Sequence, residues 1–212
     1  MPVKFHHICV CICTFKRPQL LKRLLLELDR QETSGLFSYS IVVVDNDRVM
    51  SAQHIVQSFQ QLSNIEVRYC LEPEQSIALA RNRAVENAKG DFIAFIDDDE
   101  YPDRQWLLTL FLAFNTFKVD GILGPVLPYY EQEPPQWIIK GKFHERPSHA
   151  TGTVLHWTKT RTGNVLLRSS LSGTRPNRDG SHNPSRDVER FSRWARSEKL
   201  MRRYSPDDIP AA

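Results

Sequence analysis

Residues 78–99, ALARNRAVENAKGDFIAFIDDD, pass from a helical pattern into a strand and end in three aspartates. The helix is predicted from Ser76 to Ala88 and ends at Lys89-Gly90, because glycine readily adopts the left-handed conformation that closes a helix. Phe92–Ile96 follows as a short apolar run, which favours a buried strand. The stretch therefore predicts a helix that leads directly into a strand, as in the second half of a βαβ unit.

The same alternation extends in both directions from this stretch. Apolar runs predict further strands, and apolar stripes at helical spacing predict the helices between them. The predicted strands are Ile8–Cys13, Ser40–Val44, Ile65–Cys70 and Gly121–Val126, and the predicted helices lie at 18–28, His54–Leu62 and 102–114. This order predicts an α/β sandwich with a mostly parallel central sheet and flanking helices. The alternation stops after Pro128, beyond which Asn164–Leu167 is one further candidate strand.

Length and composition fit one globular domain, or one domain with an appendage. The chain has 212 residues, of which 41% are hydrophobic, enough for a buried core. Its longest apolar run, Leu107–Phe114, is far shorter than the ~20 residues that span a bilayer. The N-terminus lacks the basic and apolar regions of a secretory signal, so we expect a cytoplasmic protein that can still sit at the inner face of the cell membrane. Cys9, Cys11 and Cys13 share one face of a strand, which predicts buried reduced thiols.

The net charge of +3 is unevenly distributed. Residues 161–204 carry eleven Lys and Arg against four Asp and Glu, a local charge of +7. Such a segment suits phosphates or anionic lipid, or it is simply a solvated surface. Nucleic acid is not expected as a partner, because aromatic side chains do not alternate with these arginines as a stacking platform requires. Outside this segment, Arg17 is as readily explained as a surface charge as by a contact to a site.

Three polar clusters come directly after predicted strands, at Thr14, Asp45-Asn46-Asp47 and Asp97-Asp98-Asp99. The carboxyl ends of parallel strands meet at one edge of an open α/β sheet, where ligands bind. We therefore expect these clusters to form one site.

The cluster Asp97-Asp98-Asp99-Glu100 predicts a bound divalent cation. Four adjacent carboxylates repel one another, and Mg²⁺ or Mn²⁺ removes that repulsion through the oxygen ligands that these ions prefer. Such a cation would also offset the charge of a diphosphate leaving group. The alternative is capping of a helix that begins at Pro102, for which one acid is enough.

The residues around this cluster predict contacts to a nucleotide. Asp45 and Asn46 present a carboxylate and an amide that suit the edge of a nucleobase, although an Asx turn explains them equally well. Arg81 lies on a fairly apolar helix and is expected to point toward phosphate or base. Thr14 is expected to hydrogen-bond the base and Phe15 to pack against it.

The motifs CTFKRP (13–18), VVVDND (42–47) and the stretch 78–99 together resemble the bacterial family 2 glycosyltransferases of the GT-A fold. The match covers about residues 5–130, with the motifs in the family's order and spacing. The later segments GPVLPYYEQEPPQWIIKGKF and RTGNVLLR look like the branch that includes the succinoglycan glucosyltransferases of exopolysaccharide assembly.

This resemblance implies that a hexose is transferred from a nucleotide diphosphate sugar to a polysaccharide or lipid-linked oligosaccharide. It also implies inversion at the anomeric carbon, with a carboxylate as general base. The DDD matches the DXD motif of the family. The implied nucleotide-sugar-binding residues are Thr14, Phe15, Asp45, Asn46, Arg81, Asp97 and Asp98, and the implied metal ligand is Asp99.

The sequence departs from the family at the motif that supplies the base. A GGED-like motif is expected soon after Thr162-Gly163-Asn164, and none is present. The nearest equivalent is the helical segment 186–194, which makes Asp187 the candidate base, although a surface acid paired with Arg190 explains it as well. A catalytically impaired nucleotide-sugar-binding protein is therefore the alternative function.

We expect residues 1–130 to form the nucleotide-sugar-binding core. Residues 131–212 would form an acceptor-side segment that is truncated or divergent after about residue 171. In that segment Trp137, Phe143, His144 and His149 are candidates for lining the acceptor cleft, although Trp137 and Phe143 also suit an ordinary core.

Overall fold

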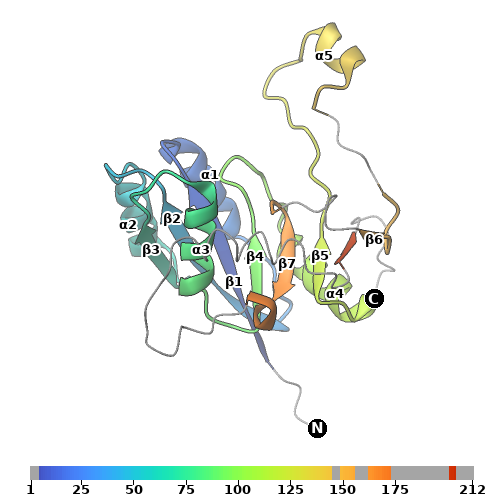
Figure 1. Ribbon diagram of the computed structural model, residues 1–212, viewed down its shortest axis with the longest axis horizontal. Coiled ribbons are helices and arrows are strands. Elements are labelled where there is room, and N and C mark those ends of the chain that lie inside the picture. The colour runs from blue at the N-terminus through green and yellow to red at the C-terminus, as the bar shows by residue number, and fades with distance from the viewer. Residues whose placement is uncertain (1–4, 145–148, 156–161, 173–200, 204–212) are drawn as a thin grey trace.

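The computed structural model describes residues 5–144, 149–155, 162–172 and 201–203 (Figure 1). These residues form an eight-stranded sheet in the order β3-β2-β1-β4-β7-β5-β8-β6. The strands are β1 (His6–Thr14), β2 (Phe37–Asp45), β3 (Val67–Leu71), β4 (Phe92–Phe95), β5 (Gly121–Leu123), β6 (Val154–Leu155), β7 (Val165–Arg168) and β8 (Met201–Arg203). The helices are α1 (Pro18–Leu28), α2 (Gln53–Leu62), α3 (Ile77–Asn87), α4 (Trp106–Phe117) and α5 (Gln136–Gly141), and a 3-10 turn spans Ser169–Ser172.

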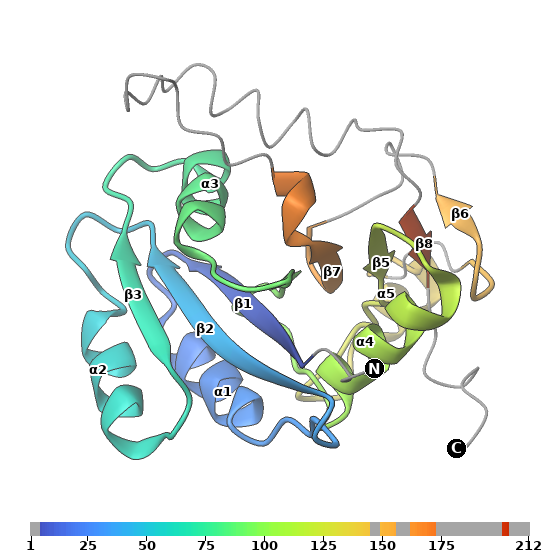
Figure 2. The ribbon, with the colours of Figure 1, turned by 90° about the horizontal axis from the view of Figure 1, so that it is seen from below.

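Strands β3, β2, β1 and β4 are parallel neighbours, which confirms the predicted central sheet. Helices α1 and α2 cover one face of these strands and α3 covers the other (Figure 2). Helix α4 lies on the same side as α1 and α2, and its apolar residues join their core. The predicted α/β sandwich with flanking helices is therefore confirmed.

Alternating side chains of β1 build the two layers of core. Ile8, Val10 and Ile12 pack with α1, α2 and α4, whereas Cys9 and Cys11 face α3. The small side chains of α3 on this face allow the helix to lie close to the sheet. All four cysteines are free, and of the three predicted to be buried thiols Cys9 and Cys11 are buried and Cys13 is partly exposed.

The far half of the sheet contains antiparallel pairs. The predicted strand near Asn164 forms as β7, and it lies between β4 and β5, antiparallel to both. Strand β5 ends at Leu123 instead of continuing to Val126, because Pro125 has no N–H for a further ladder bond. Since β7, β6 and β8 come from beyond residue 130, residues 1–130 do not complete this sheet.

A long connection after β5 carries α5 away from the sheet, and we call residues 127–144 the α5 arm (Figure 1). None of the residues of α5 is buried. Within the residues that the structure describes, there is no helix with the length and apolar character needed to cross a membrane.

Candidate functional site

The polar ends of β1, β2 and β4 meet at one edge of the sheet, as predicted. Thr14, at the end of β1, is in register with Asp45 at the end of β2, and Asp97-Asp98-Asp99 begin two residues after the end of β4. A hollow of about 480 Å³ opens at this edge, and we call it the polar hollow. It is lined by Cys13, Thr14, Phe15, Arg17, Asn46, Gln75, Ser76, Ile77, Arg81, Asp97, Asp98 and Asp99.

The three aspartates have different environments. Asp98 is 5% exposed and accepts a hydrogen bond of 2.7 Å from the hydroxyl of Thr14. The side chains of Asp97 and Asp99 are about half exposed and face the hollow. Burial raises the pKa of Asp98, and the contacts from Thr14 and Arg17 act against that rise. Asp98 is therefore a fixed part of the wall, while Asp97 and Asp99 are accessible to a ligand.

Two arginines offset the charge of this cluster. Arg17 Nη1 lies 3.2 Å from Asp98 Oδ1 and 3.0 Å from Asp99 Oδ2. Arg81 Nη2 lies 3.5 Å from Asp97 Oδ1, and its side chain is 18% exposed. The attraction of Asp98 raises the pKa of Arg17. These arginines relieve part of the repulsion among the acids, so the repulsion alone does not require a metal.

Helix capping does not account for the aspartates. The sequence placed the next helix at Pro102, but α4 begins at Trp106. Asp103 organises that start, since its carboxylate accepts a bond of 2.7 Å from the backbone N–H of Gln105. The aspartates at 97–99 lie well before this turn and face the polar hollow instead.

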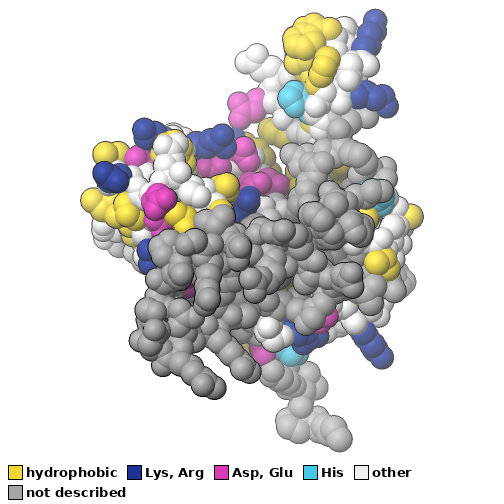
Figure 3. Space-filling view, in the orientation of Figure 1, with side chains coloured by type: hydrophobic (Ala, Val, Ile, Leu, Met, Phe, Trp, Pro, Cys, Tyr) yellow, Lys and Arg dark blue, Asp and Glu magenta, His cyan; other side chains and the backbone are white. Residues whose placement is uncertain are grey.

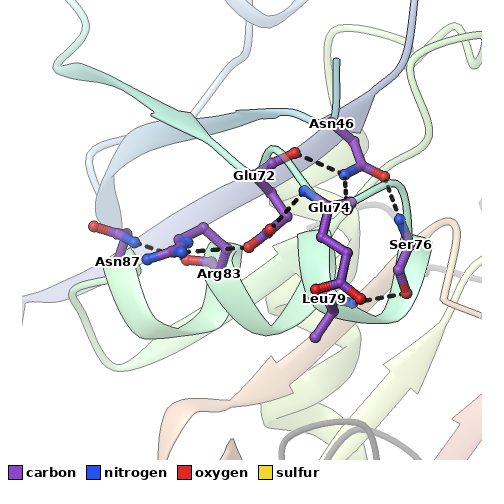
Figure 4. A network of polar contacts seen from close by, with 7 residues as sticks. All are labelled: Asn46, Glu72, Glu74, Ser76, Leu79, Arg83 and Asn87. Carbon is purple, nitrogen blue, oxygen red and sulfur yellow. Dashed lines mark hydrogen bonds and ion pairs between the residues drawn. The ribbon is translucent and has the colours of Figure 1, made fainter. Parts of the chain in front are cut away.

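Asn46 is held by bonds within the chain (Figure 4), and so is its neighbour Asp45. The Asn46 amide donates to the carbonyls of Glu72 and Glu74 at 2.9 and 2.7 Å, and its oxygen accepts from the N–H of Ser76 at 3.0 Å. Asp45 is fully buried and accepts from the N–H of Ala52 at 2.8 Å.

Asp45 also accepts from the hydroxyl of Tyr69, whose pKa rises through burial and the nearby carboxylate. The predicted contact of Asp45 and Asn46 with a nucleobase would therefore have to compete with these bonds. Asn46 fixes the start of α3 beside β2, whereas Asp45 ties the end of β2 to the N-cap of α2 and to β3.

Ser76 begins α3 and accepts the capping bond from the N–H of Leu79 at 3.5 Å. One turn later the same helix places Arg81 in the wall of the polar hollow, as the sequence predicted. Cys13 lies in the same wall, and burial raises the pKa of its thiol to about 12. At neutral pH the thiol is therefore protonated and not a nucleophile.

A second hollow of about 720 Å³ lies beside the first, and we call it the tyrosine hollow. Its wall includes Arg23, Glu100, Tyr101, Asp103, Trp106, residues 124–129, Glu131 and Asn164. Asp97 and Asp99 line both hollows, so the two spaces meet at the exposed carboxylates. Acidic side chains gather between the sheet with its flanking helices and the base of the α5 arm (Figure 3).

Aromatic and charged contacts join the base of the α5 arm to the body. The rings of Tyr101 and Tyr129 lie 4.9 Å apart. The guanidinium of Arg23 lies 3.4 Å from the centre of the Tyr101 ring and 3.1 Å from a carboxylate oxygen of Glu131. These contacts hold residues 129–131 over the tyrosine hollow.

The turn Gly163-Asn164 closes the floor of the tyrosine hollow. A side chain at residue 163 would place its Cβ 2.9 Å from carboxylate oxygens of Asp97 and Glu100, so these two carboxylates would have to shift to make room for it. Asn164 has a φ of 50° and accepts a hydrogen bond of 2.8 Å from the indole of Trp106. In the sequence, this turn served only to locate the expected GGED-like motif. In the structure it lies against the carboxylates of Asp97 and Glu100.

The predicted acceptor residues are not at this site. Trp137, Phe143 and His144 lie on the α5 arm, none of them lines the tyrosine hollow, and His149 does not line it either. Trp137 and Phe143 are 65% and 67% exposed and contact each other, so they are not core residues. The predicted base Asp187 lies outside the described residues.

Sequence reasoning missed Tyr101, Tyr129 and Arg23. Tyr129 lies within the family-like segment GPVLPYYEQEPPQWIIKGKF, but no motif links it to the other two, since the three come from α1 and two loops that only the fold brings together. Arg17 was left undecided, although its position within CTFKRP, close to the predicted ligand Thr14, was an available signal.

The carboxylates suit a divalent cation in one respect and not in another. Within the described part of the chain, no group of three or more His, Cys, Asp and Glu side chains is arranged to hold a metal ion alone. Mg²⁺, however, is commonly bound by one or two carboxylates together with substrate phosphates. Asp99 and Asp97 fit that arrangement, because both are exposed toward the polar hollow.

Comparison with known proteins agrees with this geometry. The family model described as "Glycosyl transferase family 2" matches residues 9–178. The chain belongs to glycosyltransferase family 2. Over 184 residues it is 35% identical to the succinoglycan biosynthesis protein ExoM of Rhizobium meliloti (strain 1021), covering 82% of this chain and 57% of that protein. The resemblance predicted from the motifs is therefore confirmed.

Solved structures show the same fold. Residues 1–349 of S. aureus TarS, in complex with UDP-GlcNAc, superpose with a TM-score of 0.66 at 18% identity, over 94% of this chain and 56% of that one. The mannosyltransferase PcManGT of Pyrobaculum calidifontis, in complex with GDP-Man and Mn²⁺, gives 0.62 at 16% identity, over 98% and 56%. The GT-A fold is thus confirmed, and the chain of this family 2 member spans a little over half the length of these relatives.

Proposed function

We propose that this family 2 glycosyltransferase moves a hexose from a nucleotide diphosphate sugar to a glycan acceptor, with inversion at the anomeric carbon. The observation that carries the proposal is that two hollows share a wall formed by Asp97 and Asp99. A transferase has to bring two substrates together at one bond, and adjoining sites that meet at carboxylates provide for that.

The polar hollow is the proposed donor site. Its arginines, Arg17 and Arg81, suit a diphosphate, while Thr14 and Phe15 lie where a nucleoside would be held. Asp97 is the proposed contact to ribose and sugar; Asp98, expected in the same role, could take part only by giving up its bonds to Thr14 or Arg17. The UDP-GlcNAc and GDP-Man in the two neighbouring structures support a nucleotide sugar, without choosing its base.

Asp99 is the proposed ligand of a divalent cation, with Asp97 beside it. A bound Mg²⁺ or Mn²⁺ would offset the charge of the diphosphate leaving group. The Mn²⁺ in the Pyrobaculum calidifontis structure supports this choice of cofactor. The chain's own contribution is to keep Asp99 exposed while Asp98 is held in the wall by Thr14.

The tyrosine hollow is the proposed acceptor site. Tyrosine rings and the acidic side chains of Glu100 and Asp103 suit the apolar faces and the hydroxyl groups of a sugar. Inversion requires the acceptor hydroxyl to approach opposite the leaving diphosphate, and Arg81 and α3 line the polar hollow but not the tyrosine hollow. Asp187 remains the proposed general base.

The alternative is a protein that binds a nucleotide sugar but does not transfer it. Its support is the sequence after Asn164, where the GGED-like motif is missing. Calorimetry with UDP or GDP and Mn²⁺, followed by a transfer assay on glycan acceptors, separates the two functions. Binding together with transfer supports the enzyme, binding without transfer or hydrolysis supports the alternative, and absence of nucleotide binding contradicts both.

A polysaccharide precursor, lipid-linked in its growing form, is the proposed acceptor. The similarity to a succinoglycan biosynthesis protein supports this class. The α5 arm presents Trp137, Ile139 and Phe143 to solvent next to Lys140, a combination that suits the interface of an anionic membrane. Contact with the inner face of the cell membrane, and hence a cytoplasmic location, stay predictions.

Co-sedimentation with vesicles tests the membrane contact. Binding to phosphatidylglycerol vesicles that falls on Trp137→Ser with Phe143→Ser, and not on Leu62→Ser, is the expected result. Leu62 is a suitable control because it is 86% exposed on α2, away from the α5 arm. Equal binding of both variants would contradict a role for the arm.

A further inference from the structure

The local structure around Arg17 is unfavourable, and this points to a role beyond the fold. Arg17 occupies the N-cap of α1 but makes no capping hydrogen bond, and arginine is not among the residues that favour this position. Its positive charge also lies at the positive end of the helix dipole. The preceding Lys16 has a φ of 56°, in the left-handed region that non-glycine residues rarely adopt.

Distant contacts explain why Arg17 is held there. A single nitrogen, Nη1, lies within 3.2 Å of Asp98 and within 3.0 Å of Asp99. Asp98 is fixed by the hydroxyl of Thr14 on its other oxygen, so the guanidinium has a rigid anchor. Asp99 is half exposed and is the proposed cation ligand. The positive charge of Arg17 therefore lies where a cation bound to Asp99 would repel it.

Arg17 also faces the space where a diphosphate would lie. It lines the polar hollow together with Arg81, and its side chain is 52% exposed. A guanidinium binds phosphate oxygens well, because its donors match their geometry. Arg17 thus has two partners of comparable chemistry within reach, the carboxylate of Asp99 and the phosphates of a donor.

We propose that Arg17 is an internal counter-cation of the DDD motif, which competes with the divalent metal in the free protein and contacts the diphosphate in the loaded one. The inference rests on the proposed donor site. Without nucleotide, Arg17 neutralises Asp99 and weakens metal binding. When metal and nucleotide arrive together, the diphosphate offers Arg17 another anion, and Asp99 is released to the metal. Metal and nucleotide therefore bind cooperatively, and Arg17 is a source of that coupling.

Metal titration without nucleotide tests this role directly. Mn²⁺ binding to the full chain is measured by calorimetry and by the electron paramagnetic resonance signal of free Mn²⁺, first alone and then with UDP or GDP. Arg17→Gln is expected to bind Mn²⁺ alone on the order of tenfold more tightly than the unmodified protein. The same variant is expected to bind nucleotide with Mn²⁺ more weakly, so that the coupling between the two ligands shrinks.

Two variants serve as controls. Arg17→Lys keeps the charge and is expected to bind Mn²⁺ alone as weakly as the unmodified protein. Arg30→Gln removes an arginine at the other end of α1, which pairs with the carboxylate of Glu27 away from both hollows, and the Mn²⁺ affinity of this variant is expected to stay unchanged. Thermal unfolding checks each variant, and Arg17→Met replaces Arg17→Gln if the latter does not fold.

The failure of this inference differs from a failure of the proposed function. If the unmodified protein binds Mn²⁺ with nucleotide but Arg17→Gln gains no affinity for Mn²⁺ alone, only the role of Arg17 is overturned. A gain in Arg17→Lys equal to that in Arg17→Gln also overturns it, because charge would not be the cause. If the unmodified protein binds neither UDP nor GDP in the presence of Mn²⁺, the proposed donor site and this inference are both overturned.

Discussion

The polar hollow and the tyrosine hollow share two aspartates but are built in opposite ways. The polar hollow is formed at the ends of parallel strands and by the first turns of α3, where side chains such as Asn46 are tied by several hydrogen bonds. The tyrosine hollow is formed largely by loops, and side-chain contacts of Arg23 and Tyr101 hold the base of the α5 arm over it. A site built on regular elements is rigid and common to a fold, whereas a site built on loops varies easily.

This difference suggests a division of labour. The donor carries a diphosphate that every nucleotide sugar shares, so a fixed array of arginines and aspartates serves it. Acceptors differ from one transferase to another, and loop residues can change without disturbing the sheet. Changes in the two hollows should therefore have separate consequences, one for donor binding and stability and the other for the acceptor.

Asp187→Asn should have the largest effect, and it tests whether the acceptor side supplies the base. Transfer should fall about 10²–10⁴-fold, the usual contribution of a general base, while nucleotide binding stays unchanged. Turnover is measured with donor and acceptor at saturation, and nucleotide affinity by calorimetry. Glu189→Gln, two residues along the chain, is the matched control. A fully active Asp187→Asn would move the base to another carboxylate.

Asp99→Asn tests the wall that both hollows share. Mn²⁺-dependent binding of UDP or GDP should fall by at least about 100-fold, because a direct metal ligand matters more than the outer-shell partners whose loss costs 10–100-fold. Calorimetry with and without Mn²⁺ gives the result. Asp120→Asn removes an aspartate that pairs with Arg168 away from the hollows and should leave binding unchanged. Equal loss in both variants would mean a general effect on folding.

Asn46→Ala tests the rigidity of the polar hollow. The variant removes three hydrogen bonds of a buried amide, and at about 1 kcal/mol each the free energy of unfolding should fall by about 3 kcal/mol. Urea denaturation measures this loss. Asn115→Ala removes one bond on the exposed side of α4 and should cost less than about 1 kcal/mol. A cost for Asn46→Ala as small as that of Asn115→Ala would show that the start of α3 is held by other contacts.

The two hollows also differ in how far the sequence could predict them. Thr14, Asp45 and Asp97 follow apolar strands, and parallel strands bring their ends together, so local pattern and one rule of topology were enough to place them at one edge. The same pattern did not show that Asp98 is buried while its two neighbours are exposed, since that depends on the turn after β4.

The tyrosine hollow was beyond such reasoning. Arg23 lies on α1, Tyr101 follows β4 and Tyr129 follows β5, and no motif joins them. The sequence instead suggested Trp137 and Phe143, because exposed aromatic residues on a loop cannot be told from lining residues without the path of the chain. The position of β7 between β4 and β5 was missed for the same reason, since strand pairing depends on contacts far apart in sequence.

Tyr101→Ala should have the smallest effect and the most selective one. The side chain lines the tyrosine hollow but not the polar hollow, so the KM for acceptor should rise about 5–10-fold, as expected from the loss of an aromatic contact worth about 1 kcal/mol. The KM for donor should stay the same, because no bond in the polar hollow changes.

Tyr130→Ala is the matched control for this variant. Tyr130 lies next to Tyr129 but lines neither hollow, and its ring faces His144 on the α5 arm. Kinetics with each substrate varied in turn distinguish the outcomes. A rise in the KM for acceptor in Tyr101→Ala alone would assign the tyrosine hollow to the acceptor. A rise in the KM for donor would instead show that the two hollows form one continuous donor site, with the sugar reaching past Asp97 to the tyrosines.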